Sequence, residues 1–137
     1  MNGLLLDTHV FIWYVNGNAT LNKLAQKKID AAIQHNELYL ASISLWEVSM
    51  LAKKERIILD LPCLEWLNRA LLEIRAQVLP ITSSVAVESC VLPGMFHGDP
   101  ADCLIVATTR TAGLTLLTRD SRILQYGKSK YLSTMRA

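Results

Sequence analysis

The chain has 137 residues and a formal net charge of +2, and 51% of its residues are hydrophobic, which excludes an intrinsically disordered protein. The length predicts one domain, over residues 1–137, with a substantial core. No apolar run reaches the roughly 18 residues of a membrane span, and no secretion signal opens the sequence, so we expect a cytoplasmic protein with no membrane partner.

The first half of the chain alternates short apolar runs with segments of helical periodicity. Short apolar runs are typical of buried parallel strands, and a period near 3.6 residues indicates helices. Strands are expected over Gly3–Leu6 and Leu38–Ala41. Helices are expected over Val10–Val15, over Leu21–Asn36, from Ser42 or Ser44 to about Lys54, and over Pro62–Ala76.

The second half continues the alternation. Strands are expected over Val78–Ile81 and Leu114–Thr118, with an edge strand at Tyr131–Ser133, and helices from Thr82 or Ser83 to Val91, over Asp99–Gly113, and over Ser121–Tyr126, where Gly127 is expected to end the helix. Asp99 is a suitable N-cap and Pro100 is tolerated at the first helical position. The pattern predicts an α/β sandwich: a parallel sheet of four to five short strands, flanked by helices.

Four acidic residues fall at one edge of this expected sheet. Asp7 and Asp120 directly follow strands, Glu47 lies in the first two turns of the helix after another strand, and Asp102 lies in a first helical turn. Helix capping alone could explain Asp99 and Asp102, and a salt bridge could explain Glu47. We prefer a functional carboxylate at Glu47, because its helix is otherwise nearly all apolar and an unpartnered acid is costly to bury.

Converging carboxylates repel one another unless a cation lies among them. A hard divalent cation with oxygen ligands, such as Mg²⁺, fits this set and could activate a water for phosphoryl chemistry. Zinc fits less well, because none of the four is His or Cys. The odd set of Cys63, Cys90 and Cys103 has no C-x-x-C spacing, which argues against a structural zinc site and for a reducing compartment.

The charge is distributed unevenly along the chain. Residues 1–109 carry a net charge of −3, whereas residues 110–137 carry +5, with Asp120 as their single acid. A basic segment beside a carboxylate site is suited to a polyanion partner, although an ordinary solvated surface would look the same. Candidate contacts to a polyanion are Arg119, Arg122, Lys128 and Lys130.

Four motifs resemble those of the PIN-domain ribonucleases, and most closely the VapC-type toxins of bacterial toxin–antitoxin systems. They are L-L-L-D-T-H-V-F-I-W with Asp7, S-L-W-E-V-S-M-L with Glu47, G-D-P-A-D-C-L-I-V-A with Asp102, and L-L-T-R-D-S with Asp120. Their order and spacing match over nearly the whole chain. Asp99 matches the extra acid of the D-P-x-D form, Thr118 matches a hydroxyl often found near the metal, and Cys103 stands where many relatives have Arg.

The resemblance implies a PIN-like fold and a Mg²⁺- or Mn²⁺-dependent endoribonuclease toxin that hydrolyses RNA phosphodiesters. Asp7, Glu47, Asp102 and Asp120 would hold the metal and be catalytic, with Asp99, Thr8 and Thr118 in support. It also implies a homodimer and a small cognate antitoxin, whose C-terminal segment covers the site. Toxin and antitoxin would then form a hetero-oligomer. The expected partner surfaces are apolar and lie on the helices Leu21–Asn36, Ser44–Lys54 and Pro62–Ala76, including Trp46 and Trp66.

Two alternatives from other functional classes stay open. A haloacid-dehalogenase-like phosphatase also begins with an Asp after its first strand, but it needs a second Asp two residues later, where this chain has His9. A catalytically inactive PIN-like module could bind RNA or protein. Such a module would not need Glu47 on an apolar helix together with three other acids at the same sheet edge.

Overall fold

Five short strands form one parallel sheet in the order β3-β2-β1-β4-β5 in the computed structural model, which describes residues 3–137. The strands are β1 (Leu4–Leu6), β2 (Leu38–Ala41), β3 (Gln77–Leu79), β4 (Thr115–Thr118) and β5 (Ser133–Arg136). β1 is central: Leu5 pairs with Tyr39 of β2 on one side and with Leu116 of β4 on the other. The predicted α/β fold with a parallel sheet is confirmed.

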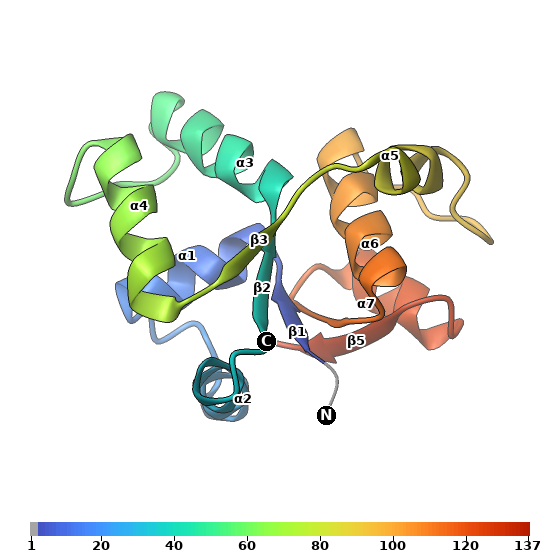
Figure 1. The fold of residues 1–137 in the computed structure, drawn as a ribbon, viewed down its shortest axis with the longest axis horizontal. Coiled ribbons are helices and arrows are strands. Elements are labelled where there is room, and N and C mark those ends of the chain that lie inside the picture. Colours follow the sequence, from blue (N-terminus) through green and yellow to red (C-terminus); the bar gives the residue numbers. More distant parts are fainter. Residues whose placement is uncertain (1–2) are drawn as a thin grey trace.

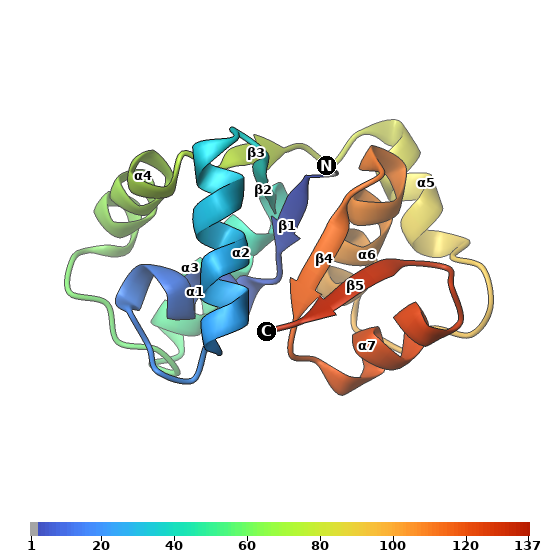
Figure 2. The same cartoon turned by 90° about the horizontal axis from the view of Figure 1, so that it is seen from below.

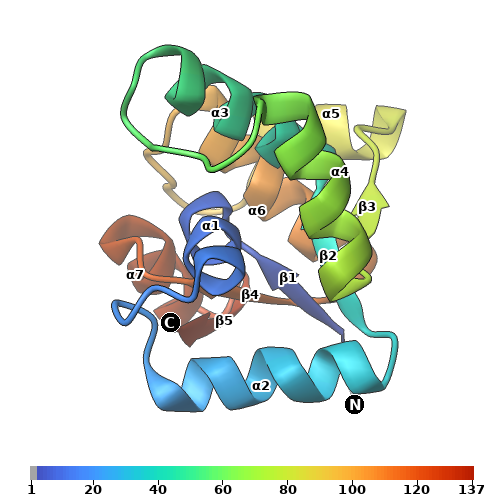
Figure 3. The same cartoon turned by 90° about the vertical axis from the view of Figure 1, so that its left-hand side faces the viewer.

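Helices cover both faces of the sheet. They are α1 (Thr8–Asn16), α2 (Lys23–Gln34), α3 (Ser42–Lys53), α4 (Cys63–Ile74), α5 (Ser83–Cys90), α6 (Pro100–Ala112) and α7 (Ser121–Lys128). Figures 1 and 2 show α1, α2 and α4 on one side of the sheet and α5 and α6 on the other, with α7 beside β5. Figure 3 faces the first of these layers and shows α2 running horizontally below α1 and α4. None of the helices in residues 3–137 is long and apolar enough to cross a membrane.

The central strand explains why its sequence is uniformly apolar. Leu4 and Leu6 pack into a core with α1, α2 and α4, whereas Leu5 points the other way and packs against Ile105 and Val106 of α6. All three leucines are buried. A strand that is covered on both faces needs apolar side chains at every position, because successive residues point to opposite faces.

Two predicted boundaries near the C-terminus are wrong for physical reasons. Gly127 does not end α7 but lies inside it, and a Cβ atom there would collide with the side chain of Thr134 on β5. Glycine therefore permits close packing of the helix on the strand rather than a stop. The edge strand β5 begins at Ser133, where the expected Tyr131–Ser133 segment ends, because the pairing with β4 begins at Thr115 and Ser133.

Other boundaries lie close to those predicted. Helix α6 has its N-cap at Asp99 and ends at Gly113, whose φ of 66° is the left-handed conformation that glycine adopts readily. Strand β3 stops at Leu79, before Pro80, which has no N–H to donate to a neighbouring strand. Trp66 does not belong to a partner surface as expected: it is 3% exposed and packs edge-on against Phe11 in the core.

Candidate active site

Five carboxylates line one cavity of about 330 Å³ at the carboxyl ends of the central strands, and the four predicted as metal ligands come from four separate elements. Asp7 follows β1 and caps α1, and Asp120 follows β4 and caps α7; the two strands are neighbours because β1 pairs with β4. Glu47 comes from α3 and Asp102 from the first turn of α6. The other residues that line the cavity are Thr8, His9, Val10, Trp13, Asp99, Arg119 and Arg122.

The Asp7 carboxylate is held by two hydrogen bonds. Oγ1 of Thr118 donates to Oδ2 over 2.6 Å, and the backbone N–H of Thr8 donates to Oδ1 over 2.9 Å. Burial raises the pKa of Asp7 above its ordinary value, and the two hydrogen bonds oppose this shift without cancelling it. The side chain is therefore fixed in orientation and poorly compensated in charge.

Glu47 is half-buried and is oriented by α1. Oγ1 of Thr8 donates to Oε1 over 2.6 Å, and the same hydroxyl lies 2.8 Å from Oγ of Ser44, which can donate to it. Burial raises the pKa of Glu47, and the charges of Asp7 and Asp99 add to the shift. The sequence pattern predicted only a helix cap at Ser44. Its position three residues before Glu47, on the same helical face, is the signal that could have identified it as part of the site.

Asp99 and Asp102 differ in their surroundings. Oδ1 of Asp99 accepts the backbone N–H of Asp102 over 2.9 Å, which is an N-cap contact. The side chain of Asp102 is only 14% exposed. Burial, followed by repulsion from Asp99, Asp7 and Asp120, raises the pKa of Asp102 to about 6. Asp102 thus lies where negative charge is poorly tolerated.

Two of the four basic candidates reach the cavity. Arg122 places one guanidinium nitrogen 3.8 Å from Oδ2 of both Asp102 and Asp120, but it is 61% exposed, so water screens these pairs. Arg119 stacks over Trp13, at 5.2 Å from the ring centroid, and its Nε donates to the carbonyl of Ala137. Lys128 and Lys130 do not line the cavity.

The arrangement is chemically suited to a cation. Carboxylate oxygens are the donors that hard divalent ions prefer, and three of these acids have raised pKa values, chiefly because burial disfavours the charged form. Within residues 3–137, no three His, Cys, Asp or Glu side chains are grouped tightly enough to hold an ion as they stand. Mg²⁺ is usually bound through only one or two carboxylates plus waters, so a tight cluster of three side chains is not a requirement for binding it.

Comparison with known proteins gives a consistent result. The sequence profile of the PIN domain matches residues 4–129. Ribonuclease VapC22 of Mycobacterium tuberculosis is 41% identical over 123 residues, which cover 90% of this chain and 91% of that protein. The fold is similar to DNA-bound VapBC from Salmonella typhimurium, with a TM-score of 0.71, 17% identity, and coverage of 99% and 98% of the two chains. It is also similar to a toxin–antitoxin complex from Klebsiella pneumoniae, with a TM-score of 0.59, 22% identity, and coverage of 87% and 88%.

Proposed function

The chain belongs to the PIN-domain family, and from that premise we propose that it is a metal-dependent endoribonuclease, the toxin of a type II toxin–antitoxin pair. The observation that carries the proposal is the convergence of Asp7, Glu47, Asp102 and Asp120 on one cavity. The name of the mycobacterial relative supports RNA as the substrate. We further propose that residues 1–137 form one PIN-like domain, which acts in the cytoplasm, where RNA is available.

The four acids are proposed to hold Mg²⁺ or Mn²⁺. Asp7 and Asp102 are the principal candidates, because they combine burial with raised pKa values and so benefit most from a nearby cation. A bound ion would act as a Lewis acid on the phosphodiester and would lower the pKa of a coordinated water. Thr118 and Thr8 fix the orientation of Asp7 and Glu47, which is what a positioned oxygen donor set requires.

Arg122 is the side chain best placed to bind the substrate phosphate. It lies beside Asp102 and Asp120 at the open border of the cavity, and its exposed guanidinium can bond two phosphate oxygens at once. Arg119 is less available, because it is engaged with Trp13 and with the backbone of Ala137. Lys128 and Lys130 are proposed to attract the RNA backbone farther from the carboxylates.

A small antitoxin is proposed to cover an apolar groove between α3 and α4. This groove has a volume of about 510 Å³ and is lined by Ser49, Ala52, Lys53, Cys63, Leu64 and Leu67. Leu64 is 71% exposed and Trp46 of α3 is 55% exposed, as expected of a surface that a partner covers. The antitoxin would bring a basic side chain to the carboxylates and so compete with the metal or the RNA.

A homodimer is also proposed, with α5 as one candidate contact. Val87 of α5 and Val91, which caps its C-terminal end, lie four residues apart and are 63% and 64% exposed. Two apolar side chains at this spacing form a stripe that a second copy can cover through a two-fold axis. A protein that stays monomeric at high concentration in sedimentation measurements would remove this part of the proposal.

The central test is RNA cleavage by the purified, antitoxin-free chain. Structured RNAs should be cut in the presence of Mn²⁺ or Mg²⁺, and EDTA should stop the reaction. Asp7→Asn should be inactive, whereas Asp60→Asn, an exposed acid outside the cavity, should cut at the wild-type rate. Cleavage that persists under full chelation would overturn the metal dependence. Binding of RNA without cleavage under any divalent ion would favour the inactive-module alternative.

A further inference from the structure

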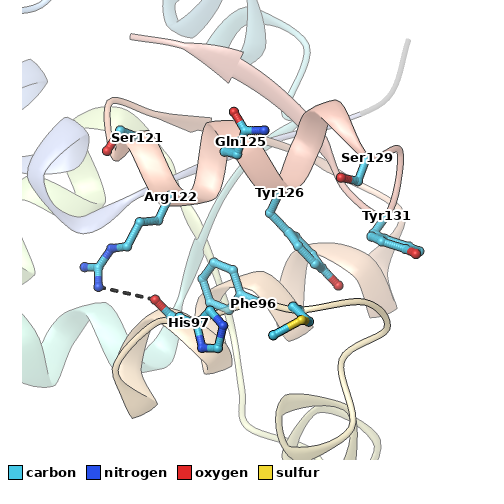
Figure 4. Close-up of a pocket in the computed structure, with 9 residues that line it drawn as sticks. Phe96, His97, Ser121, Arg122, Gln125, Tyr126, Ser129 and Tyr131 are labelled. Carbon is cyan, nitrogen blue, oxygen red and sulfur yellow. Dashed lines mark hydrogen bonds between the residues drawn. The ribbon is translucent and has the colours of Figure 1, made fainter.

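A second cavity, of about 290 Å³, borders the carboxylate cavity and shares one residue with it, Arg122. Its walls come from residues 95–97, which precede α6, and from α7 with the turn that follows it. Figure 4 shows Arg122 at one end, the aromatic rings of Phe96 and Tyr126 in the middle, and Tyr131 at the other end. Met95, His97, Ser121, Gln125 and Ser129 complete the lining.

We propose that this cavity, here called the base pocket, binds one nucleobase of the RNA strand next to the scissile phosphate. The inference rests on the proposed ribonuclease function and adds a determinant of sequence preference to it. Because the two cavities share Arg122, a strand with a phosphate at the carboxylates would place a neighbouring nucleotide at the entrance of the base pocket.

The aromatic wall of the base pocket is fixed in place. Tyr126 is buried, its ring centroid lies 5.1 Å from that of Phe96 and 5.4 Å from that of Tyr131, and its hydroxyl donates to the carbonyl of Pro93 over 2.6 Å. Phe96 is half-buried and Tyr131 is 40% exposed, so both can offer ring surface to a ligand. Proteins recognise unpaired RNA bases chiefly by stacking them on such rings.

Polar groups around the rings are free to contact a base edge. The side chains of Ser121, Gln125 and Ser129 are exposed and form no hydrogen bond with any residue in the described range 3–137. The Gln125 amide offers both a donor and an acceptor, which matches the mixed edges of nucleobases. Arg122 donates to the carbonyl of His97 over 3.3 Å, and this bond keeps the guanidinium at the border between the two cavities.

Charge and size favour a nucleotide over a protein segment as the occupant. Six of the nine residues that line the base pocket belong to the basic part of the chain, where residues 110–137 carry six Lys or Arg and one acid. A polyanion is attracted there, whereas the groove proposed for the antitoxin lies between α3 and α4. The volume lies at the lower end of the range for small-ligand pockets, which suits one base.

The test measures binding of short fluorescent single-stranded RNAs to the full chain in EDTA, so that no cleavage occurs. The tightest of four homopolymers is then resynthesised with each nucleotide abasic in turn. For the intact RNA, Phe96→Ala should raise Kd by about fivefold or more, the lower end of what stacking contributes. For RNA that is abasic at one particular position, Phe96→Ala and wild type should bind equally.

A second variant keeps the test independent of packing at Phe96. Gln125→Ala removes an exposed side chain and should change the ranking of the four bases at that same position. Gln34→Ala, an exposed glutamine on α2, is the matched control and should change nothing. An abasic scan that is identical in wild type and both pocket variants overturns the base pocket. If the two pocket variants no longer capture the antitoxin but bind RNA as wild type does, the base pocket is also overturned, because the cavity then binds a protein partner.

The outcome separates the base pocket from the ribonuclease proposal. If the effect of Phe96→Ala on binding disappears when one particular nucleotide is abasic, but no RNA is cleaved under Mn²⁺ or Mg²⁺, the base pocket is retained and the nuclease function is removed. If wild type cleaves RNA but the effect of Phe96→Ala on binding is the same whichever nucleotide is abasic, the nuclease function is retained and the base pocket is removed.

Discussion

Thr118 and Asp7 are separated by 111 residues in the chain, yet Oγ1 of Thr118 donates a hydrogen bond of 2.6 Å to Oδ2 of Asp7. The same hydroxyl oxygen accepts the backbone N–H of Asp120 over 3.0 Å. One buried threonine therefore sets the positions of two of the four carboxylate residues. This is possible because β1 and β4 are adjacent and their ends lie side by side.

Replacing Thr118 by Val should reduce cleavage and metal affinity by about 10- to 100-fold, the usual cost of removing a group that orients a ligand. Valine fills the same space but cannot donate to Asp7, so the pKa of Asp7 should rise further. Thr118→Ser retains the donor and should recover most of the activity. Mn²⁺ titration by calorimetry and RNA cleavage rates check this. Equal metal affinity in the Val and Ser variants would contradict the orienting role.

Asp7→Asn should abolish cleavage without loss of stability in metal-free buffer. Asparagine remains a good N-cap for α1, and it removes a carboxylate whose pKa is raised by burial. The free energy of urea unfolding at neutral pH in EDTA should equal or exceed that of wild type. A marked loss of stability would show that the charge of Asp7 is compensated in the folded protein, against our interpretation of its pKa.

Asp99 and Asp102, the two acids at the start of α6, should differ in their effects on RNA cleavage. Asp99→Ser keeps a capping oxygen, so its stability should change by less than about 1 kcal/mol and its cleavage should persist. Asp102→Asn should lose most activity. Unfolding curves and cleavage rates for both variants provide the comparison. If Asp99→Ser were folded and as inactive as Asp102→Asn, the assignment of Asp99 as mainly a cap would be wrong.

The free energy of unfolding of the metal-free protein, measured in EDTA, should fall as pH rises from about 4 to about 6. Burial raises the pKa of Asp102 from 3.8 to about 6, so in this window the folded protein binds a proton that the unfolded chain releases. At about 1.4 kcal/mol per unit of pKa, the loss is about 1–3 kcal/mol. Raised pKa values at Asp7 and Glu47 act in the same direction.

Thermal melts at pH 5 and pH 7 check this dependence, and Asp102→Asn should have a shallower slope. Mn²⁺ should reverse the trend, because the ion binds the deprotonated carboxylates and stabilises the fold more at the higher pH. Unfolding that becomes harder with increasing pH in EDTA would contradict the prediction.

Leu64→Glu should weaken the complex with the antitoxin, tested with the product of a small reading frame next to this gene. Leu64 is 71% exposed and lines the groove between α3 and α4, so a charge there opposes burial by an apolar partner. Ile81→Glu, at a 45% exposed position outside the helices expected to bind a partner, is the matched control. Co-purification and melting temperatures distinguish lost binding from lost folding. Equal capture by the two variants would place the antitoxin elsewhere.

Periodicity and strand–helix alternation were sufficient to predict the fold class, because each strand and most helices carry their own local signal. The convergence of Asp7 and Asp120 also followed, since both come directly after parallel strands. Prediction failed where the signal was not local. Gly127 has the form of a helix stop, and only the approach of Thr134 from β5 explains why it lies inside α7.

Side-chain contacts across the fold were beyond the reach of sequence patterns. Thr8 and Thr118 were predicted as supporting residues, but the hydroxyl contact between Thr8 and Ser44 depends on how α1 meets α3. The exposure of Trp46 and the burial of Trp66 show the same limit. Both are aromatic residues on helices with apolar stripes, and only the packing of α4 on α1 decides which tryptophan enters the core.

The strand order has a consequence for the cell that makes this protein. β1 is synthesised well before its neighbour β4, because Thr118 follows Asp7 by 111 residues. At about 5–20 residues per second, the ribosome needs about 5 to 20 seconds to cover that distance. Throughout this interval the nascent chain has Asp7 but neither Thr118 nor Asp120. The carboxylate site therefore cannot assemble while only β1 has been made, and the proposed cleavage of RNA cannot begin until β4 and Asp120 have followed.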